Sequence, residues 1–423
     1  MWGLGSNYAR LLASSAASNL ADGIFFIALP LLAVRLTDSP VLAAGIGIAG
    51  RLPWLVFVLV AGALADRLDR RATMRNVQVF RAGAVGAMAV MAVTGTLSLP
   101  VLYVAAFVLG VVETLFDTAA QSILPSLVDR DQLAKANGRL YAVELVANAF
   151  VGPPLGGLMM AVSVGLALGG SALGYVLAAL ALLLITGSFK PQREGPPTRI
   201  TADIAEGLRY LVRHRLLLTL AIMVGLMNLA SSATQAIFVL YAVAPGPMGL
   251  SEPLFGVLIT AFAIGSLAGS LLAERVERRV GREAILLVAL VVSAATLAVP
   301  GFTANPILVG VSFAVSGAFM VMWNVITVSL RQRIVPDALL GRVNSAYRLF
   351  AWGTQPLGAL LGGVIGQLLG LPAVFVFAGA LVLVLLLLRG GISNREIAHA
   401  EAEAAVAAPL PPDTTDAAAT PAT

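Results

Sequence analysis

Long apolar runs recur along the chain and are separated by short polar segments. The hydrocarbon core of a bilayer is about 30 Å thick, so a helix of roughly 20 mostly apolar residues spans it. By this measure the sequence predicts an all-α polytopic membrane protein with twelve transmembrane helices. The predicted spans lie near residues 12–34, 41–65, 74–97, 100–122, 140–161, 164–187, 217–243, 254–274, 284–301, 305–328, 343–367 and 371–388.

The composition excludes several classes of protein. Hydrophobic residues make up 59% of the chain and charged residues 12%, whereas soluble domains are about 45–50% apolar and about 25% charged. A soluble enzyme with one membrane anchor is therefore excluded. The chain has no cysteine and only two histidines, His214 and His399, both in polar stretches. We expect no enzyme, no metal site and no cofactor.

The basic residues predict the orientation. Nearly all of the 27 lysines and arginines lie in the N-terminus, the even-numbered loops or the C-terminal segment. Such residues collect on the cytoplasmic face of membrane proteins. The net charge of +5 therefore indicates a lipid bilayer as partner rather than a nucleic acid. We expect a multi-pass protein of the plasma or inner membrane with both termini in the cytoplasm.

The chain repeats itself at an interval of about 200 residues. The stretch Ala65–Arg71 follows the second predicted span, and the similar stretch Ala273–Arg279 follows the eighth. Pro154-Leu155-Gly156 likewise recurs as Pro356-Leu357-Gly358. Matching offsets predict two pseudo-symmetric six-helix bundles in the same orientation. A parallel duplication of this kind forms a transport site between two bundles.

These patterns divide the chain into four parts. Residues 1–189 form the N-terminal bundle and 217–390 the C-terminal bundle. Residues 190–216 form a cytoplasmic linker with an amphipathic helix, which either lies on the inner leaflet or is an ordinary linker helix. Residues 391–423 are rich in Ala, Pro and Thr and too poor in large apolar groups to fold alone, so we expect a disordered cytoplasmic tail.

One loop motif resembles the signature of a known family. The stretch Gly62-x-Leu64-x-Asp66-Arg67-x-x-Arg70-Arg71 is similar to the loop between spans two and three of the major facilitator superfamily, although Asp69 stands where that family has a glycine. Asp tolerates a tight-turn backbone better than most residues. The resemblance covers residues 8–390 and implies that family's fold, with members that act as monomers. It also implies a conformational latch of charged and small residues at the inner ends of spans two, four and eleven. The latch comprises Gly62, Asp66, Arg67, Arg70, Arg71, Asp117 and Arg342.

A second motif, Gly152-Pro153-Pro154-Leu155-Gly156-Gly157, resembles the antiporter motif of the same superfamily. There Gly152, Pro153, Gly156 and Gly157 would form a kinked, closely packed helix that implies export, whereas the plainer interpretation is helix packing alone. The stretches Ser122–Val128 and Val335–Ser345 are similar to the macrolide-efflux and enterobactin-exporter-like branch. Span four departs from better-known drug–proton antiporters, because it lacks their arginine.

Ionisable residues inside a membrane are costly, and each is a candidate for function. We expect Asp22 and Glu113 to face a central cavity, where Arg51 keeps at least one of them ionised and a proton binds and leaves as access changes. The alternative is a static ion pair with Arg51. Glu144 is expected in a structural ion pair, and Arg81 as a partner for an acid or for lipid phosphate.

Polar groups in the apolar spans are candidates for the substrate cavity. These are Asn148, Asn228, Gln235, Trp323, Asn324, Tyr347 and Arg348. Such stripes also occur at ordinary helix contacts, which is the alternative interpretation. A cavity of aromatic residues and a few amides suits a bulky amphipathic ligand, and Arg348 could instead recognise an anion.

The sequence thus predicts a secondary active transporter that exports amphipathic drugs or secondary metabolites by alternating access, with the proton gradient as its energy source. One alternative is export of a specific metabolite such as a siderophore, with Arg348 or Arg51 binding an acid group. An alternative of a different class is a transport-inactive sensor or scaffold, which predicts no substrate flux.

Overall fold

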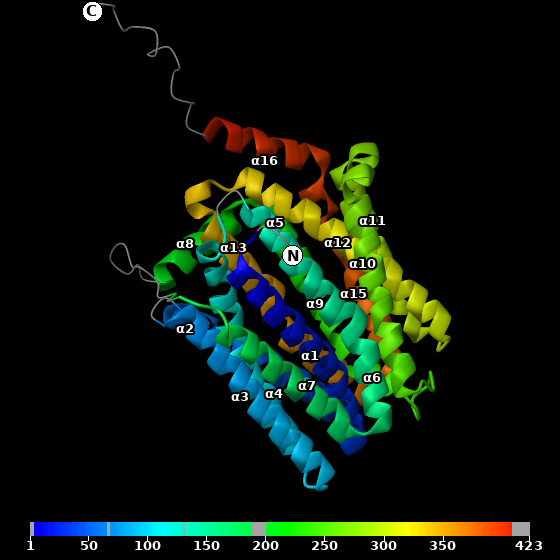
Figure 1. Ribbon diagram of the computed structural model, residues 1–423. Coiled ribbons are helices and arrows are strands. Elements are labelled where there is room, and N and C mark those ends of the chain that lie inside the picture. Colours follow the sequence, from blue (N-terminus) through cyan, green and yellow to red (C-terminus); the bar gives the residue numbers. More distant parts are fainter. Residues whose placement is uncertain (1–3, 66–67, 130–131, 188, 190–199, 408–423) are drawn as a thin grey trace, which may run out of the picture.

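The structure, a computed structural model, describes residues 4–65, 68–129, 132–187, 189 and 200–407. Within these residues the chain is helical and has one isolated β-bridge, between Val243 and Leu250, but no strand. The helices run side by side in a bundle, and a C-terminal helix lies across one end (Figure 1). This is the all-α architecture that the apolar runs predict.

The predicted spans correspond to long helices, four of which consist of more than one helical segment. In the N-terminal half they are α1 (Ser6–Leu36), α2 (Pro40–Ala65), α3 (Arg70–Val93), α4 (Leu99–Ile123), the series α5 (Leu133–Glu144), η3 (Leu145–Val151) and α6 (Gly152–Val162), and α7 (Val164–Leu183). In the C-terminal half they are α9 (Arg215–Ala242), α10 (Glu252–Val280), α11 (Arg282–Ala298) with η4 (Val299–Gly301), α12 (Pro306–Ile334), α13 (Asp337–Gly353) with α14 (Gln355–Leu369), and α15 (Leu371–Val384) with η5 (Leu385–Ile392).

Eleven helices of the described chain are long and apolar enough to cross a membrane. The predicted second span corresponds to α2, an apolar helix of 26 residues that is not among these eleven. Eleven spans are therefore found, and the number twelve stays a prediction.

The two halves repeat the same helix pairings. In the N-terminal half α2 packs on α4, α3 on α7 and α1 on α6; in the C-terminal half α10 packs on α12, α11 on α15 and α9 on α14. These are the second with the fourth, the third with the sixth and the first with the fifth span of each half. The equivalence is what a duplicated chain requires.

The halves meet at the end of the bundle that is predicted to be extracellular. There α2 packs against α14 and α6 against α10. Arg35, at the end of α1, forms an ion pair of 2.6 Å with Glu252, at the start of α10. Ser39 donates a hydrogen bond of 3.1 Å to Gln367 at the end of α14. These contacts close the bundle at this end.

The linker contains the predicted helix, α8 (Ile200–Arg213). It packs against α13, with Leu211 fully buried and Gly207 close to the backbone of Arg342. The apolar face of this helix therefore contacts protein, as in the interpretation as a linker helix. Residues 190–199 of the predicted linker lie outside the described residues.

The prediction of a disordered tail is wrong for its first part. Residues Asn394–Ala407 form helix α16, which lies across the end of the bundle (Figure 1). Ile397 and Ala400 are buried against the C-terminal half, and Glu401 forms an ion pair of 2.7 Å with Arg282. The segment lacks enough apolar groups to fold alone, but these tertiary contacts supply what it lacks. Residues 408–423 lie outside the described part.

Candidate substrate cavity

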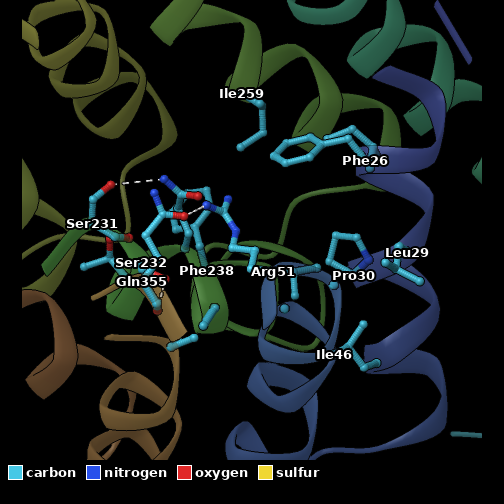
Figure 2. A pocket seen from close by; sticks show the side chains of 18 of the residues that line it. Phe26, Leu29, Pro30, Ile46, Arg51, Ser231, Ser232, Phe238, Ile259 and Gln355 are labelled. Carbon is cyan, nitrogen blue, oxygen red and sulfur yellow. Dashed lines mark hydrogen bonds between the residues drawn. The ribbon is translucent and has the colours of Figure 1, made fainter. Parts of the chain in front are cut away.

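A cavity of about 1290 Å³ lies between the two halves, and residues of both halves line it. Figure 2 shows Phe26 and Pro30 of α1 on one side of this space and Ile259 and Phe238 on others. Its walls are predominantly apolar, as in sites that bind hydrophobic ligands. The phenylalanines among them are Phe25, Phe26, Phe238, Phe255, Phe262, Phe313 and Phe375.

A charged cluster on the N-terminal wall is centred on Asp22. Its Oδ1 lies 2.8 Å from Nη2 of Arg81 and accepts a hydrogen bond of 2.8 Å from the hydroxyl of Tyr175. Its Oδ2 accepts a hydrogen bond of 3.4 Å from Ser18. Helices α1, α3 and α7 thus converge on one carboxylate, and their mutual packing holds this geometry.

Glu113 of α4 shares the same cation. Its Oε2 lies 3.9 Å from Nη2 of Arg81, and its side chain is 47% exposed, compared with 23% for Asp22. Arg81 itself is only 5% exposed, and its guanidinium lies 4.7 Å from the centre of the Tyr175 ring. Two carboxylates of different accessibility therefore line the cavity beside one buried arginine.

Arg51 lines the cavity, but its hydrogen bond is to a residue of the other half. Its guanidinium donates a hydrogen bond to Oε1 of Gln355, at the start of α14 in the other half (Figure 2). Within the described chain, the ion pairs of Asp22 and Glu113 are both with Arg81. No ion pair of Arg51 with either acid is found among the described residues, and Arg81 is the partner for an acid that the sequence suggested. The charge of Arg51 still acts on Glu113, so its role in keeping that acid ionised stays a prediction.

The C-terminal wall carries a different set of groups. Arg348 of α13 lines the cavity, and its guanidinium lies 5.4 Å from the centre of the Trp352 ring. Gln235 of α9 also lines it and donates a hydrogen bond of 3.0 Å to Ser231. Asn148 lines the opposite, N-terminal side. Of the predicted cavity residues, these three have the expected position.

The other four predicted cavity residues do not line this space. Asn228 donates a hydrogen bond of 2.6 Å to the carbonyl of Ala351. Trp323 is buried in the core of the C-terminal half. Tyr347 is buried beneath the guanidinium of Arg331, which lies 3.7 Å from its ring centre. Asn324 lies on an exposed face of α12. The first three belong to helix contacts, as in the alternative interpretation.

The glycine motif of α6 packs against both halves. A side chain on Gly152 would collide with Gly23 of α1, and one on Gly156 with the backbone of Ile24. A side chain on Gly157 would collide with the backbone of Glu252 of α10, in the other half. A side chain on Gly256 of α10 would likewise collide with the backbone of Pro153. The motif thus allows α6 to lie directly against its neighbours on both sides; its link to export stays a prediction.

The predicted latch is described only in part. Asp66 and Arg67 lie outside the described residues, and so do the surroundings of Gly62 and the side chain of Asp117. Arg71 donates hydrogen bonds to the carbonyls of Leu182 and Leu183 at the end of α7. Arg342 pairs with Glu206 of α8, and Arg70 begins α3. The latch itself stays a prediction.

Asp69 explains the departure from the signature motif. Its backbone is extended, with φ −64° and ψ 120°, so no tight turn requires a glycine there, contrary to our reasoning from the sequence. Its carboxylate accepts hydrogen bonds of 2.8 Å from the amides of Ala72 and Phe189 and thus caps α3. Burial raises the pKa of Asp69, but these hydrogen bonds and the charge of Arg71 together bring it below the usual value.

Two residues have roles that the sequence did not predict. Glu144 forms no ion pair with the described residues and is exposed at the end of α5, so the predicted structural pair is absent there. The apolar pattern did not single out Tyr175, which is the only tyrosine in the predicted span 164–187. A tyrosine hydroxyl in a largely apolar span requires a partner, and that requirement was the available signal.

Comparison with known proteins gives a consistent result. A family model described as a transmembrane secretion effector matches residues 6–418. The multidrug efflux pump Tap of Mycolicibacterium fortuitum is 30% identical over 395 residues, which are 89% of this chain and 93% of that protein. The enterobactin exporter EntS of Citrobacter koseri is 27% identical over 343 residues, or 79% of each chain.

Solved transporter structures share the fold. The nucleoside transporter NupG superimposes with a TM-score of 0.71 at 13% identity, covering 92% of this chain and 100% of that one. A bacterial homologue of the iron transporter ferroportin in an inward-facing state has a TM-score of 0.70 at 17% identity, covering 90% and 97%.

Proposed function

The chain belongs to the transmembrane secretion effector family of major facilitator superfamily efflux transporters, and we propose that it exports amphipathic drugs or secondary metabolites in exchange for protons. The observation that carries this proposal is the pair of carboxylates, Asp22 and Glu113, beside one arginine in the cavity between the halves. The protein works in the cell membrane as a monomer, with both termini in the cytoplasm.

Alternating access follows from the division into two halves. Contacts such as Arg35–Glu252 join the halves at the predicted extracellular end, so the described arrangement is the one that takes up substrate from the cytoplasm. Rocking of the halves would separate this end and close the other. The small residues Gly157 and Gly256, where α6 meets α10, provide a surface over which the helices turn.

The proton acts on the Asp22–Arg81–Glu113 cluster. With both acids ionised, one guanidinium compensates two negative charges, and a proton on the more exposed Glu113 leaves Arg81 paired with Asp22 alone. Like charges that share a site favour binding of one proton. A proton from outside therefore changes the charge of the wall from which the substrate leaves, and its release inside resets the cluster.

The test uses inside-out membrane vesicles that contain the protein or a variant. An imposed proton gradient should drive uptake of a fluorescent lipophilic compound, and an uncoupler should abolish it. We expect Asp22→Asn and Glu113→Gln each to reduce this uptake at least tenfold, whereas Glu274→Gln, an exposed change outside the cavity, leaves it intact. Undiminished uptake by both cavity variants would refute proton coupling through this cluster.

Export of a specific acidic metabolite is the second candidate. It is favoured by the likeness to an enterobactin exporter and by the position of Arg348 in the cavity. The sensor or scaffold alternative predicts no flux of any substrate in the same vesicles.

A further inference from the structure

We propose that the cavity selects amphipathic molecules that carry an acidic group, and that Arg348 binds this group. The inference rests on the proposed function only in taking the cavity as the path of the substrate. It concerns what the cavity binds, and binding is measurable without transport.

The two walls of the cavity differ in charge. Both carboxylates that line it, Asp22 and Glu113, belong to the N-terminal half, where Arg81 pairs with them. The residues of the C-terminal half that line it include serines, threonines and glutamines, but no acid. Arg348 is the charged residue of that wall. An acidic ligand group would therefore find on the C-terminal side a cation that pairs with no acid among the described residues.

Arg348 is available to a ligand. Its side chain is exposed in the cavity, and no described carboxylate lies within ion-pairing distance of it. The ring of Trp352 supports its guanidinium at 5.4 Å, which orients the group without neutralising it. Arg51, the other candidate for this role, differs from Arg348 because the charge of a carboxylate, Glu113, acts on it; it also donates a hydrogen bond to Gln355.

A second arginine strengthens the positive potential behind Arg348. Arg331 of α12 is 8% exposed and lies 3.7 Å from the centre of the ring of Tyr347, the neighbour of Arg348 in the chain. Its Nε and Nη1 have no hydrogen-bond partner among the described residues. Two cations without a described acid thus lie in one region of the C-terminal half. Charges in a site of low dielectric act more strongly than in water.

The apolar body of such a ligand has a matching surface. Phe238 contacts Phe313 at 5.0 Å and Phe255 at 6.0 Å between ring centres, and Phe375 at 6.2 Å. This aromatic cluster belongs to the same half as Arg348. A guanidinium binds a carboxylate through two parallel hydrogen bonds, so the ligand is oriented with its acid at Arg348 and its apolar part against the rings.

The test compares two ligands that differ only in charge. They are 11-(dansylamino)undecanoic acid and its primary amide, titrated by dansyl fluorescence onto the full-length protein in nanodiscs of neutral lipid near pH 7.5. We expect the acid to bind about tenfold more tightly than the amide, the size of one charged hydrogen-bonded contact. Arg348→Gln should bring this ratio to about one while the affinity for the amide stays the same.

Two further variants keep the result specific. Arg348→Lys retains the charge and should keep part of the preference, whereas Arg278→Gln, which removes an exposed arginine on α10, should keep all of it. Equal affinity of the unmodified protein for acid and amide would overturn the inference. An equal loss of affinity for both ligands in Arg348→Gln would overturn it as well. No saturable binding of the acid would overturn it too. A preference without gradient-driven uptake would support this inference and refute the proposed function; uptake without the preference would do the reverse.

Discussion

The two halves have the same helix pairings but different charged residues. In the N-terminal half Arg81 lies over Tyr175 and pairs with Asp22 and Glu113. In the C-terminal half Arg331 lies over Tyr347, and no described acid pairs with it. One half thus holds a buried cation with two carboxylates, and the other holds the same cation–aromatic contact alone.

The difference separates two tasks. A proton needs a carboxylate, and the cavity carboxylates belong to the N-terminal half. Binding of an acidic ligand needs an unpaired cation, and Arg348 supplies it in the C-terminal half. In the proposed mechanism, proton and ligand bind to opposite walls and so do not compete for one residue, and the motion of the halves couples the two events.

Joining the halves permanently should have the largest effect. The chain has no cysteine, so Ser39→Cys with Gln367→Cys creates one pair across the closed end, where Oγ of Ser39 lies 3.1 Å from Oε1 of Gln367. Because the glutamine side chain spans part of this distance, the pair is joined by a short bis-methanethiosulfonate cross-linker. We expect the cross-linker to abolish gradient-driven uptake and a reductant to restore it. Each single variant, treated with the same reagent, is the control. Full uptake by the cross-linked protein would exclude opening of this end.

Removing Arg81 should be the most costly single substitution in the charged clusters. Arg81→Gln leaves two carboxylates together in the cavity wall and should lower the free energy of unfolding by about 3 kcal/mol. The matched change Arg331→Gln leaves no acid behind and should cost less than about 1 kcal/mol. Thermal unfolding in detergent compares the two. Equal losses of unfolding free energy would show that the two acids beside Arg81 do not make it more costly to remove than Arg331.

Deleting α16 should destabilise the C-terminal half to a smaller extent. Truncation after Ser393 exposes the surface that Ile397 covers and removes the ion pair between Glu401 and Arg282. We expect a loss of about 2 kcal/mol, chiefly from burial of one large apolar side chain. Truncation after Ala407 is the control and should leave thermal stability unchanged. If both truncations behave alike, α16 does not stabilise the bundle.

The smallest effect concerns pH at the linker. Burial lowers the pKa of His214 from its ordinary value of 6.5, and the nearby carboxylates of Glu403 and Glu396 only partly oppose this. The neutral form is therefore favoured in the folded protein, so its contribution to stability is present above about pH 6.5 and is lost as the pH falls. His214→Gln should reduce the fall in Tm between about pH 7.5 and 5.5 by about 1 °C, whereas His399→Gln, at an exposed site, should not.

The fold was predictable from hydropathy because a bilayer imposes the same requirement on every helix that spans it. Lipid requires long apolar helices, and the cost of an intramembrane charge predicts that Asp22 and Glu113 face the interior, which the cavity bears out. The cation between them was not predictable in the same way. Arg51 and Arg81 lie in neighbouring spans, and only the rotation of each helix decides which one reaches the acids.

Polar residues in the C-terminal half show a second limit. Asn228 and Gln235 lie on the same helix, yet one bonds to the backbone of α13 and the other lines the cavity. A stripe of polar groups is compatible both with a helix contact and with a cavity wall, and only the packing of the helices decides which role each residue has. Helix α16 was missed for a related reason, since its partners, such as Arg215 and Arg282, lie more than a hundred residues away.

The wide turn of η3 has a consequence for how the fifth span can move. Residues Leu145–Val151 form a π-helix, which holds more residues per turn than an α-helix. A shift of its hydrogen bonds by one residue would turn α5 by about 100° about its own axis, while Gly152 and Gly157 keep their contacts with α1 and α10. Asn148 lies inside this segment and lines the cavity. The π-helix would thus allow one part of the span to rotate. Such a rotation would change which side chain faces the ligand, while the contact between α6 and α10 stays in place.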